Sequence, residues 1–275
     1  MPSIEVAEQA GVGLDGLARP TEDRVVVLPH AVVLLDGATA TRPDARSGGW
    51  YAQQLSLAIG QRLAAAPAAN LVDLLADAIA AVAAEHGLTP GDSPSSTVAI
   101  ARWTEHGVDA LVLADSPVVA FTRDGAALPL VDERLALLPR PGGYRARLRG
   151  GGGYGGDHAA AVRESAERVG ALRNRPGGFW VAEADPAAAR HAVTASWPRA
   201  ELTAVLLASD GVSCGVDDYG VFPDWTAVRN LAADQGAQAV LDRVRAAELS
   251  DPTGQRWPRP KVHDDQALAL VNFAE

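Results

Sequence analysis

Four apolar segments of the chain each meet an aspartate at one end. The apolar run of "AVVLLDGATA" stops at Asp36, that of "ALVLADSPVV" at Asp115 and that of "AVLLASDGVS" at Asp210, while Asp264 and Asp265 precede the run of "VHDDQALALV". If these strands are neighbours, the carboxylates meet at one end of a sheet, repel one another and raise each other's pKa values. Mg²⁺ and Mn²⁺ prefer oxygen ligands of this kind and would remove the repulsion. The pattern therefore predicts a site for such ions.

Glycine follows two of these aspartates, as Gly37 after Asp36 and as Gly211 after Asp210. We expect the glycine to adopt unusual backbone angles, so that a backbone carbonyl can turn toward an ion. A single Asp-Gly pair is more typical of a plain turn, but the recurrence of the junction favours the metal site. Two ions ~3.5–4 Å apart can clamp a phosphate and lower the pKa of a shared water, which supports in-line hydrolysis without a protein nucleophile.

Hydrophobic periodicity and turn residues predict the elements that must carry these aspartates. Two helices are followed by consecutive strands, which is not the alternation of a parallel sheet and favours an α+β fold with antiparallel sheet. We interpret 107–125 as a hairpin pair with turns at 115–117 and 124–125, and we expect Asp185 to cap a helix that begins near Pro186. The other predicted strands lie within 24–35, 91–103, 203–209 and 265–273, and the other predicted helices within 47–66, 71–86, 158–174 and 225–247.

Composition limits the class of protein. A chain of 275 residues with 48% hydrophobic and 21% charged residues is typical of a soluble globular protein with a substantial core. We find no internal repeat and no linker, so we predict a single domain over 1–275, with a Gly-rich loop or flap over about 139–157. The net charge of −10 argues against binding to nucleic acid.

The same composition bears on the compartment. Cys214 is the only cysteine, so no intrachain disulfide can form, which fits a reducing cytosol. The first ten residues lack the basic and apolar regions of a secretory signal, and no segment approaches the ~20 apolar residues of a membrane span. We therefore expect a cytoplasmic protein without membrane insertion. The six histidines lack metal-ligand spacing, which argues against zinc.

The aspartate segments and their flanks also occur in the order of a known family. The segments "PTEDRVVVL", "VVLLDGAT", "SSTVAIA", "LVLADSPVV", "LLASDGV" and "HDDQALALV" span residues 19–272. Together they resemble the metal-dependent PPM (PP2C-type) serine/threonine phosphatases, in the form found in bacteria. The resemblance implies an αββα sandwich, in which two antiparallel sheets lie between helices and metal ions bind in a cleft at one end.

The resemblance also implies a metal-binding set. Asp36 matches the aspartate that bridges two metal ions, and Gly37 matches the glycine whose carbonyl binds one of them. Asp210 and Asp264 match the two aspartates that hold the other ion. Asp115 matches a position that helps to bind a third, weaker ion in bacterial members. The implied cofactors are two Mn²⁺ or Mg²⁺ ions, with a third as a further option.

Further roles follow from the same resemblance. Glu22 and Asp23 match a Glu-Asp pair that holds metal-bound waters, including the nucleophile. Together with the three metal-binding aspartates, Asp23 completes the expected catalytic set. Ser96 and Thr97 match a Ser-Thr pair that we interpret as a structural support of the strands.

Three departures from the family pattern keep an alternative open. In "DGATA", Ala38 cannot act as a general acid, so protonation of the leaving group needs metal-bound water or another donor. Where the family pattern reads "GDSR", this chain reads "ADSP", so an arginine and a glycine of that pattern are lost. Cys214 stands where many members carry another aspartate, which weakens a third metal site unless Asp217 or Asp218 substitutes. These changes motivate the alternative of a non-catalytic relative that binds metal or partner proteins, whereas the intact aspartates favour an enzyme.

Several arginines are candidates to bind a phosphate. Arg19 lies one position away from the phosphate-binding arginine of eukaryotic members, and Arg42 and Arg46 follow the Asp36 motif. Three arginines of the Gly-rich segment could present guanidinium groups to a phosphopeptide: Arg145, Arg147 and Arg149. For each of these arginines, a solvated surface position is the plainer interpretation.

The leading hypothesis is a protein phosphatase. It would hydrolyse phosphoserine or phosphothreonine on proteins in bacterial signalling, by one-step attack of a metal-activated water. The expected partner is a phosphoprotein substrate, and we expect a monomer. A HAD-type phosphatase with Asp36 as covalent nucleophile is disfavoured. Ala38 replaces the second aspartate of Asp-x-Asp, and the lysine that this family carries before its final acidic motif is found here only after "SDG", as Lys261.

Overall fold

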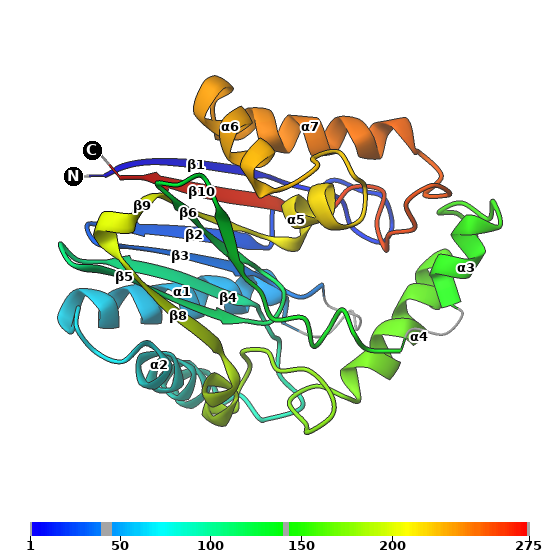
Figure 1. Cartoon of the computed structure of the whole chain (residues 1–275). Coiled ribbons are helices and arrows are strands. Elements are labelled where there is room, and N and C mark those ends of the chain that lie inside the picture. Colours follow the sequence, from blue (N-terminus) through cyan, green and yellow to red (C-terminus); the bar gives the residue numbers. More distant parts are fainter. Residues whose placement is uncertain (1, 40–45, 140–142, 274–275) are drawn as a thin grey trace.

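Two antiparallel β-sheets lie face to face in the structure, a computed structural model that describes residues 2–39, 46–139 and 143–273 (Figure 1). In this part of the chain each sheet has five strands. The first sheet has the order β1 (Ser3–Gln9), β10 (Gln266–Asn272), β9 (Leu202–Ala208), β6 (Val118–Thr122) and β7 (Ala127–Leu130). The second has the order β2 (Asp23–Leu28), β3 (Ala31–Asp36), β4 (Val98–Trp103), β5 (Gly107–Leu113) and β8 (Val193–Pro198).

Helices cover the outer faces of both sheets (Figure 1). The second sheet carries α1 (Gly48–Ala65) and α2 (Leu71–His86), and the first carries α5 (Asp210–Asp217), α6 (Trp225–Gln235) and α7 (Ala237–Ser250). Two further helices, α3 (Gly143–Arg149) and α4 (His158–Gly170), extend from one end of the sandwich, and short 3-10 helices cover Pro186–His191 and Arg199–Glu201. The predicted α+β sandwich of two antiparallel sheets between helices is confirmed.

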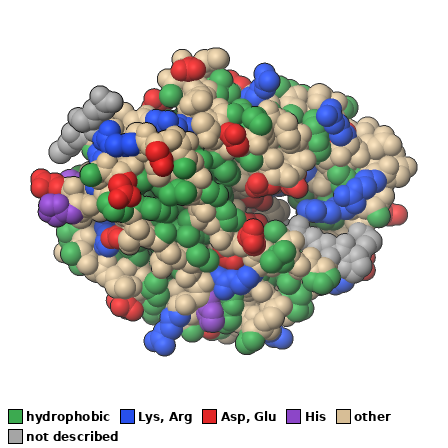
Figure 2. Space-filling model, in the orientation of Figure 1, with side chains coloured by type: hydrophobic (Ala, Val, Ile, Leu, Met, Phe, Trp, Pro, Cys, Tyr) green, Lys and Arg blue, Asp and Glu red, His purple; other side chains and the backbone are tan. Residues whose placement is uncertain are grey.

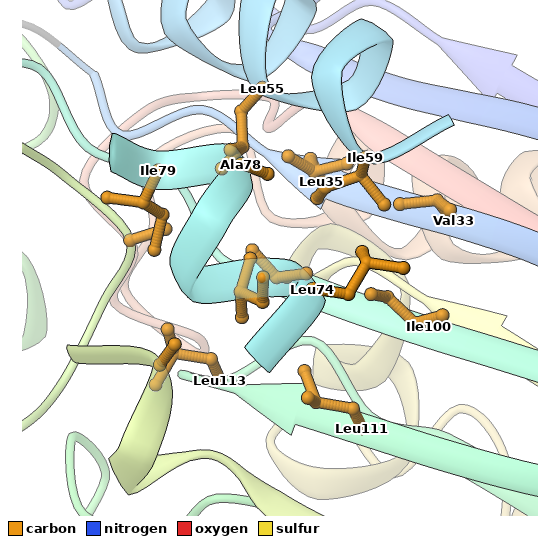
Figure 3. Close-up of a cluster of buried hydrophobic side chains, with 14 of the residues drawn as sticks. Val33, Leu35, Leu55, Ile59, Leu74, Ala78, Ile79, Ile100, Leu111 and Leu113 are labelled. Atoms are coloured by element: carbon orange, nitrogen blue, oxygen red, sulfur yellow. The ribbon is translucent and has the colours of Figure 1, made fainter. Parts of the chain in front are cut away.

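Strand β3 shows how the sequence produces these layers. Val33 and Leu35 pack against α1 and α2, whereas Val32 and Leu34 pack between the two sheets. Because successive side chains of a strand point to opposite faces, a strand buried on both faces appears in the sequence as a continuous apolar run. Figure 3 shows the helix-facing side of this core, where side chains of β3, β4 and β5 meet those of α1 and α2.

The helix boundaries follow from capping residues. The Ser47 hydroxyl and the Asn70 side chain accept hydrogen bonds from the first turns of α1 and α2. Gly87 ends α2 in the left-handed conformation with φ of 62°, which glycine adopts without steric cost. Asp185 caps the 3-10 helix as expected, since its side chain accepts from the amide of Ala187 at 2.9 Å. The predictions of helices over 47–66 and 71–86 are confirmed.

Of the two hairpins predicted over 107–125, the second is confirmed and the first is wrong. Strands β6 and β7 do pair across the turn at 124–125, but β5 belongs to the second sheet and β6 to the first. The chain therefore crosses from one sheet to the other at 114–117. Ala114 has a left-handed φ of 67°, and its amide donates to Asp132 at 3.1 Å. Turn residues mark where a chain reverses, but they do not show which sheet the next strand joins.

The loop predicted over 139–157 is also wrong in part, because 143–149 forms α3. Leu148 of α3 is fully buried and anchors the helix. Arg147 donates to the carbonyl of Gly155 at 2.8 Å, so the Gly-rich segment folds back on its own helix. Among the helices of the described ranges, none has the length and apolar character that a membrane crossing requires.

Candidate active site

Both sheets bring strand ends to one edge of the sandwich. In the second sheet Asp23 and Asp36 are directly opposite each other in the register of β2 and β3. In the first sheet Asp210 comes two residues after β9 ends, and Asp264 comes two residues before β10 begins. The charges of Asp210 and Asp264 act on both Asp23 and Asp36. The structure thus brings together aspartates that are far apart in the sequence.

Burial and mutual repulsion perturb these carboxyl groups. Burial raises the pKa of Asp23, and the charges of Asp210 and Asp264 raise it further. Burial likewise raises the pKa of Asp36, with the charges of Asp23 and Asp210 adding to the effect. Burial raises the pKa of Asp210 to about 7, assisted by the charges of Asp264 and Asp115. The group of carboxylates would therefore be stabilised by additional positive charge.

The donor set fits a hard divalent cation in its chemistry. Asp23 is fully buried, and neither of its carboxyl oxygens has a hydrogen bond of normal geometry among the described residues, although the nearby Ser209 hydroxyl acts to lower its pKa. A buried carboxylate without such bonds is costly, and a cation or its bound waters would relieve that cost. Within the described ranges, no three His, Cys, Asp or Glu side chains are grouped so that they could hold a metal ion as they stand. Asp36 and Asp210 do meet, because a hydrogen bond between their side chains acts to raise the pKa of Asp36 and to lower that of Asp210.

Backbone and hydroxyl groups hold Asp36 from two sides. The hydroxyl of Thr97 accepts from the amide of Asp36 at 2.9 Å and lies 2.6 Å from the hydroxyl of Ser116. The hydroxyl of Ser96 donates to the carbonyl of Asp36 at 2.9 Å. The structural role expected for Ser96 and Thr97 is confirmed, since the pair fixes the backbone that carries Asp36.

The glycines beside the aspartates serve a different purpose from the one expected. Neither Gly37 nor Gly211 has a positive φ. A Cβ on Gly37 would lie 2.3 Å from the carbonyl carbon of Gly48, and one on Gly211 would lie 1.9 Å from the carbonyl oxygen of Asp265. The expectation of unusual backbone angles is wrong. These positions are glycine because another backbone segment passes too close for a side chain.

Two cations of the chain itself partly neutralise the acidic edge. Arg19 forms ion pairs with Glu22 and with Asp265, the latter at 2.6 Å. The Lys261 ammonium lies 2.5 Å from a carboxyl oxygen of Asp264 and 3.8 Å from Asp265. Burial acts to lower the pKa of Lys261, but the charges of Asp264 and Asp265 outweigh it and leave that pKa raised. Lys261 is therefore a charged ammonium inside the site.

The arginines predicted to bind phosphate are engaged elsewhere or lie outside the described residues. Arg19 is held by the two carboxylates named above, so its phosphate-binding role stays a prediction. Arg42 falls outside the described residues. Arg46 lies at the cleft with its guanidinium 4.6 Å from the ring of Trp50, and it donates to the carbonyl of His86 at 3.3 Å. Arg145 donates to the hydroxyl of Tyr144 at 3.0 Å.

The aspartates open into a cleft of about 910 Å³. Figure 2 shows this hollow, with acidic side chains gathered inside it and basic side chains near its edge. Its acidic end is lined by Asp36, Asp115, Asp210, Asp264 and Lys261. Apolar side chains also line the cleft: Val162 and Val169 of α4, Phe179 and Val181 of the segment before the 3-10 helix, and Leu135. The acidic end of this cleft attracts cations, and an anionic ligand would bind there only with metal ions that offset the charge of the carboxylates.

Cys214 lies one turn after Asp210 on α5, because the two residues are four positions apart in a helix. Burial raises the pKa of the Cys214 thiol, and the charges of Asp210 and Glu248 add to that effect. A protonated thiol is neither a metal ligand nor easily oxidised. Asp217 is influenced by the charge of Asp218, and its side chain bonds to Ser213. These contacts give no sign that Asp217 substitutes for the lost aspartate.

Sequence reasoning missed Lys261 and Asp265 as members of the site. The signal for Lys261 was available, because it is the only lysine of the chain and stands three residues before Asp264. The role of Asp265 was not visible, since it depends on Arg19 and on the amide of Gly11, which donates to Asp265 at 2.7 Å. Both contacts join segments from opposite ends of the chain.

Comparison with solved structures identifies the fold as that of the PPM serine/threonine phosphatases. The chain is similar to MsPP from Mycobacterium smegmatis, solved with cacodylate, at 17% identity and a TM-score of 0.58 over 99% of this chain and 98% of that one. It is also similar to PstP/Ppp from Mycobacterium tuberculosis, at 14% identity and a TM-score of 0.59 over 100% and 99% of the two chains. Stp1 from Staphylococcus aureus matches at 14% identity and a TM-score of 0.55 over 100% and 96%.

One further solved structure contains the catalytic domain of PstP in complex with two manganese ions, and it matches at 14% identity and a TM-score of 0.57 over 100% and 99% of the two chains. No protein-family model and no curated protein matches the sequence. At these identities the likeness establishes the fold. The resemblance inferred from the sequence segments is thereby confirmed for the architecture.

Proposed function

We propose that this chain is a divalent-metal-dependent phosphatase that hydrolyses phosphoserine and phosphothreonine on proteins. The observation that carries the proposal is the meeting of aspartates from both sheets at one end of a cleft, in the fold of serine/threonine phosphatases. The manganese complex of PstP supports Mn²⁺ or Mg²⁺ as the cofactor. We further propose one domain over 1–275 that acts as a cytoplasmic monomer in bacterial signalling.

The residues that would hold the metal ions are those at the acidic edge. Asp36 would hold both ions, the carbonyl of Gly37 would bind one of them, and Asp210 and Asp264 would hold the other. When bound, the ions would supply an activated water and stabilise charge on the phosphoryl oxygens. Water oxygen would bond to phosphorus as the ester bond to the serine or threonine oxygen breaks, which leaves phosphate and a free hydroxyl. Asp115 is the proposed contact for a third ion.

Glu22 and Asp23 would orient water at this edge. Asp23 is suited to that role because its two buried oxygens have no hydrogen bond of normal geometry among the described residues. The carboxylate of Glu22 is held by Arg19 and by the amide of Gly49 at 3.4 Å, so it is fixed in place. Ala38 contributes no proton, and the leaving hydroxyl must take its proton from water.

The test is hydrolysis of a phosphothreonine peptide with Mn²⁺ and with EDTA. We expect turnover with Mn²⁺ alone and a loss of at least about 100-fold in Asp36→Asn, which removes a metal-binding charge. Asp242→Asn serves as a control, since Asp242 is an exposed carboxylate of α7. Absence of turnover with Mn²⁺, or full activity in Asp36→Asn, would contradict the proposal.

A non-catalytic protein that binds metal or a partner is the second candidate. It is favoured by the ion pair of Lys261 with Asp264 and by the lack, in the described ranges, of carboxylates grouped to hold an ion as they stand. Calorimetric titration with Mn²⁺ separates the two candidates. Binding of Mn²⁺ without hydrolysis of any phosphopeptide favours the second.

A further inference from the structure

Lys261 links the two segments that would carry the metal ions. Its ammonium lies 2.5 Å from a carboxyl oxygen of Asp264, which precedes β10. It also donates to the hydroxyl of Thr39 at 3.3 Å, in the loop that follows Asp36. That loop, "DGATA", is where the sequence departs from the family pattern. The lysine and the unusual loop are therefore in contact.

The position of Lys261 is fixed by its neighbours in the chain. The residue is only 6% exposed. On one side, the carbonyl of Pro260 accepts a hydrogen bond from the ring of the buried His158 at 2.8 Å. On the other side, the carbonyl of Val262 accepts from the guanidinium of Arg259 at 2.9 Å. The backbone on both sides of Lys261 is thus held, and the ammonium is directed to the cleft that it lines.

An ammonium and a divalent cation compete for the same carboxylate. The carboxyl oxygen of Asp264 that Lys261 contacts is one that a metal ion would need. Like charges repel strongly at short range where water is excluded. The side chain of lysine is flexible and binds as a point charge, so it can leave the carboxylate when a stronger cation arrives. The cleft of about 910 Å³ beside Lys261 gives the displaced ammonium room.

We propose that Lys261 is a built-in competitor of the divalent cation at Asp264, which makes this chain load metal more weakly than the same site without the lysine. The proposal rests on the proposed function, since it concerns the same metal site. It adds a property that follows from the contacts of Lys261: the metal-free state is stabilised by an internal cation. The enzyme would then require a higher concentration of Mn²⁺ to become active.

Calorimetric titration of the full chain with MnCl₂ tests the proposal. We expect Lys261→Met to bind Mn²⁺ at least about 10-fold more tightly than the wild type, because the competing charge is gone. Lys261→Arg, which keeps the charge, should stay within about threefold of the wild type. Arg243→Met is the matched control, since it removes an exposed positive charge on α7 and should leave the affinity unchanged.

The proposal is overturned if Lys261→Met binds Mn²⁺ no more tightly than the wild type, or if Lys261→Arg gains as much affinity as Lys261→Met. Thermal unfolding in EDTA verifies that the variants are folded, and Lys261→Gln repeats the comparison with a polar side chain. The titration does not depend on turnover. Tighter binding in Lys261→Met without hydrolysis supports this proposal and rejects the phosphatase, whereas hydrolysis with unchanged affinity does the reverse.

Discussion

The pKa of Asp210 shows how the acidic edge perturbs a single residue. Its pKa is raised to about 7, first by burial and then by the charges of Asp264 and Asp115. In the unfolded chain an aspartate titrates near pH ~3.9. Between these two values the folded state binds more protons than the unfolded state, so stability falls as the pH rises through the window. Below pH ~4 both states are protonated and this cost is absent.

The metal-free protein should therefore lose stability between about pH 4 and about pH 7. Each pKa unit corresponds to about 1.4 kcal/mol, and partial exposure of Asp210 reduces the effect to an order of 2 kcal/mol, or about 5 °C in Tm. Calorimetric unfolding in EDTA measures the slope, and Asp210→Asn should flatten it. Asp23 and Asp36, whose pKa values burial also raises, and Glu248, whose pKa burial raises to about 7, keep part of the slope in that variant. A Tm that is level across this range would contradict the prediction.

At the scale of elements, the start of α1 is pressed against the loop that carries Asp36. A Cβ on Gly48 would lie 2.2 Å from the carbonyl oxygen of Ala38 and 2.5 Å from the carbonyl carbon of Gly37. Contacts this short cannot be tolerated, so the helix and the loop would have to separate. The close approach keeps the amide of Gly49 within 3.4 Å of Glu22, which couples the helix N-terminus to the site.

Replacing Gly48 by alanine should destabilise the protein by about 2–3 kcal/mol, even though alanine favours helices. Urea unfolding measures the loss. Gly170→Ala is the control, because Gly170 is also helical but a Cβ there meets nothing within 4 Å. That variant should be neutral or gain up to about 1 kcal/mol. Equal changes in the free energy of unfolding for the two substitutions would show that the short contact at Gly48 does not cause the loss of stability.

Elements with long apolar runs were predictable from the sequence, and those without were not. Strands β3 and β9 are buried along nearly their whole length, so their runs stand out. Strand β8 alternates between half-buried and exposed positions and ends in Pro198, and β1 carries Glu5, Glu8 and Gln9. Neither has an apolar run. Helix α5 starts at Asp210 directly after β9, where the sequence indicates only a turn.

The aspartates of the site were predictable for the same reason, since they end or precede apolar runs. The meeting of these aspartates at one edge was not predictable, because it depends on which strands share a sheet. Lys261 and Asp265 escaped prediction since their roles come from contacts with Thr39 and Arg19, more than 200 residues away. No local pattern encodes such contacts.

At the scale of the whole molecule, the acidic edge is where the two sheets meet. Asp23 and Asp36 belong to the second sheet, whereas Asp210 and Asp264 flank strands of the first. Elsewhere the sheets pack mainly through apolar side chains, in a core that includes Val32, Leu34 and others of both sheets. A cation held by both pairs would add a polar link at one end of that apolar interface.

Mn²⁺ should therefore stabilise both sheets together. At a concentration of 100 times Kd the gain is about 2.7 kcal/mol. Hydrogen exchange should slow in the ends of β2 and β3 and equally in those of β9 and β10. Asp36→Asn should show neither the exchange effect nor the rise in Tm. Protection confined to one sheet would contradict a site shared between the two.

The glycines at 37, 48 and 211 bear on how such chains diverge. They are required by backbones in contact, and those contacts belong to the fold whether or not any reaction takes place there. Replacing a carboxylate of the acidic edge would remove charge and leave these backbone contacts intact, whereas replacing one of the glycines would force the packed segments apart. The glycines are therefore a requirement of folding that is separate from any requirement of chemistry. A chain with this backbone would keep them even where the neighbouring aspartate had changed.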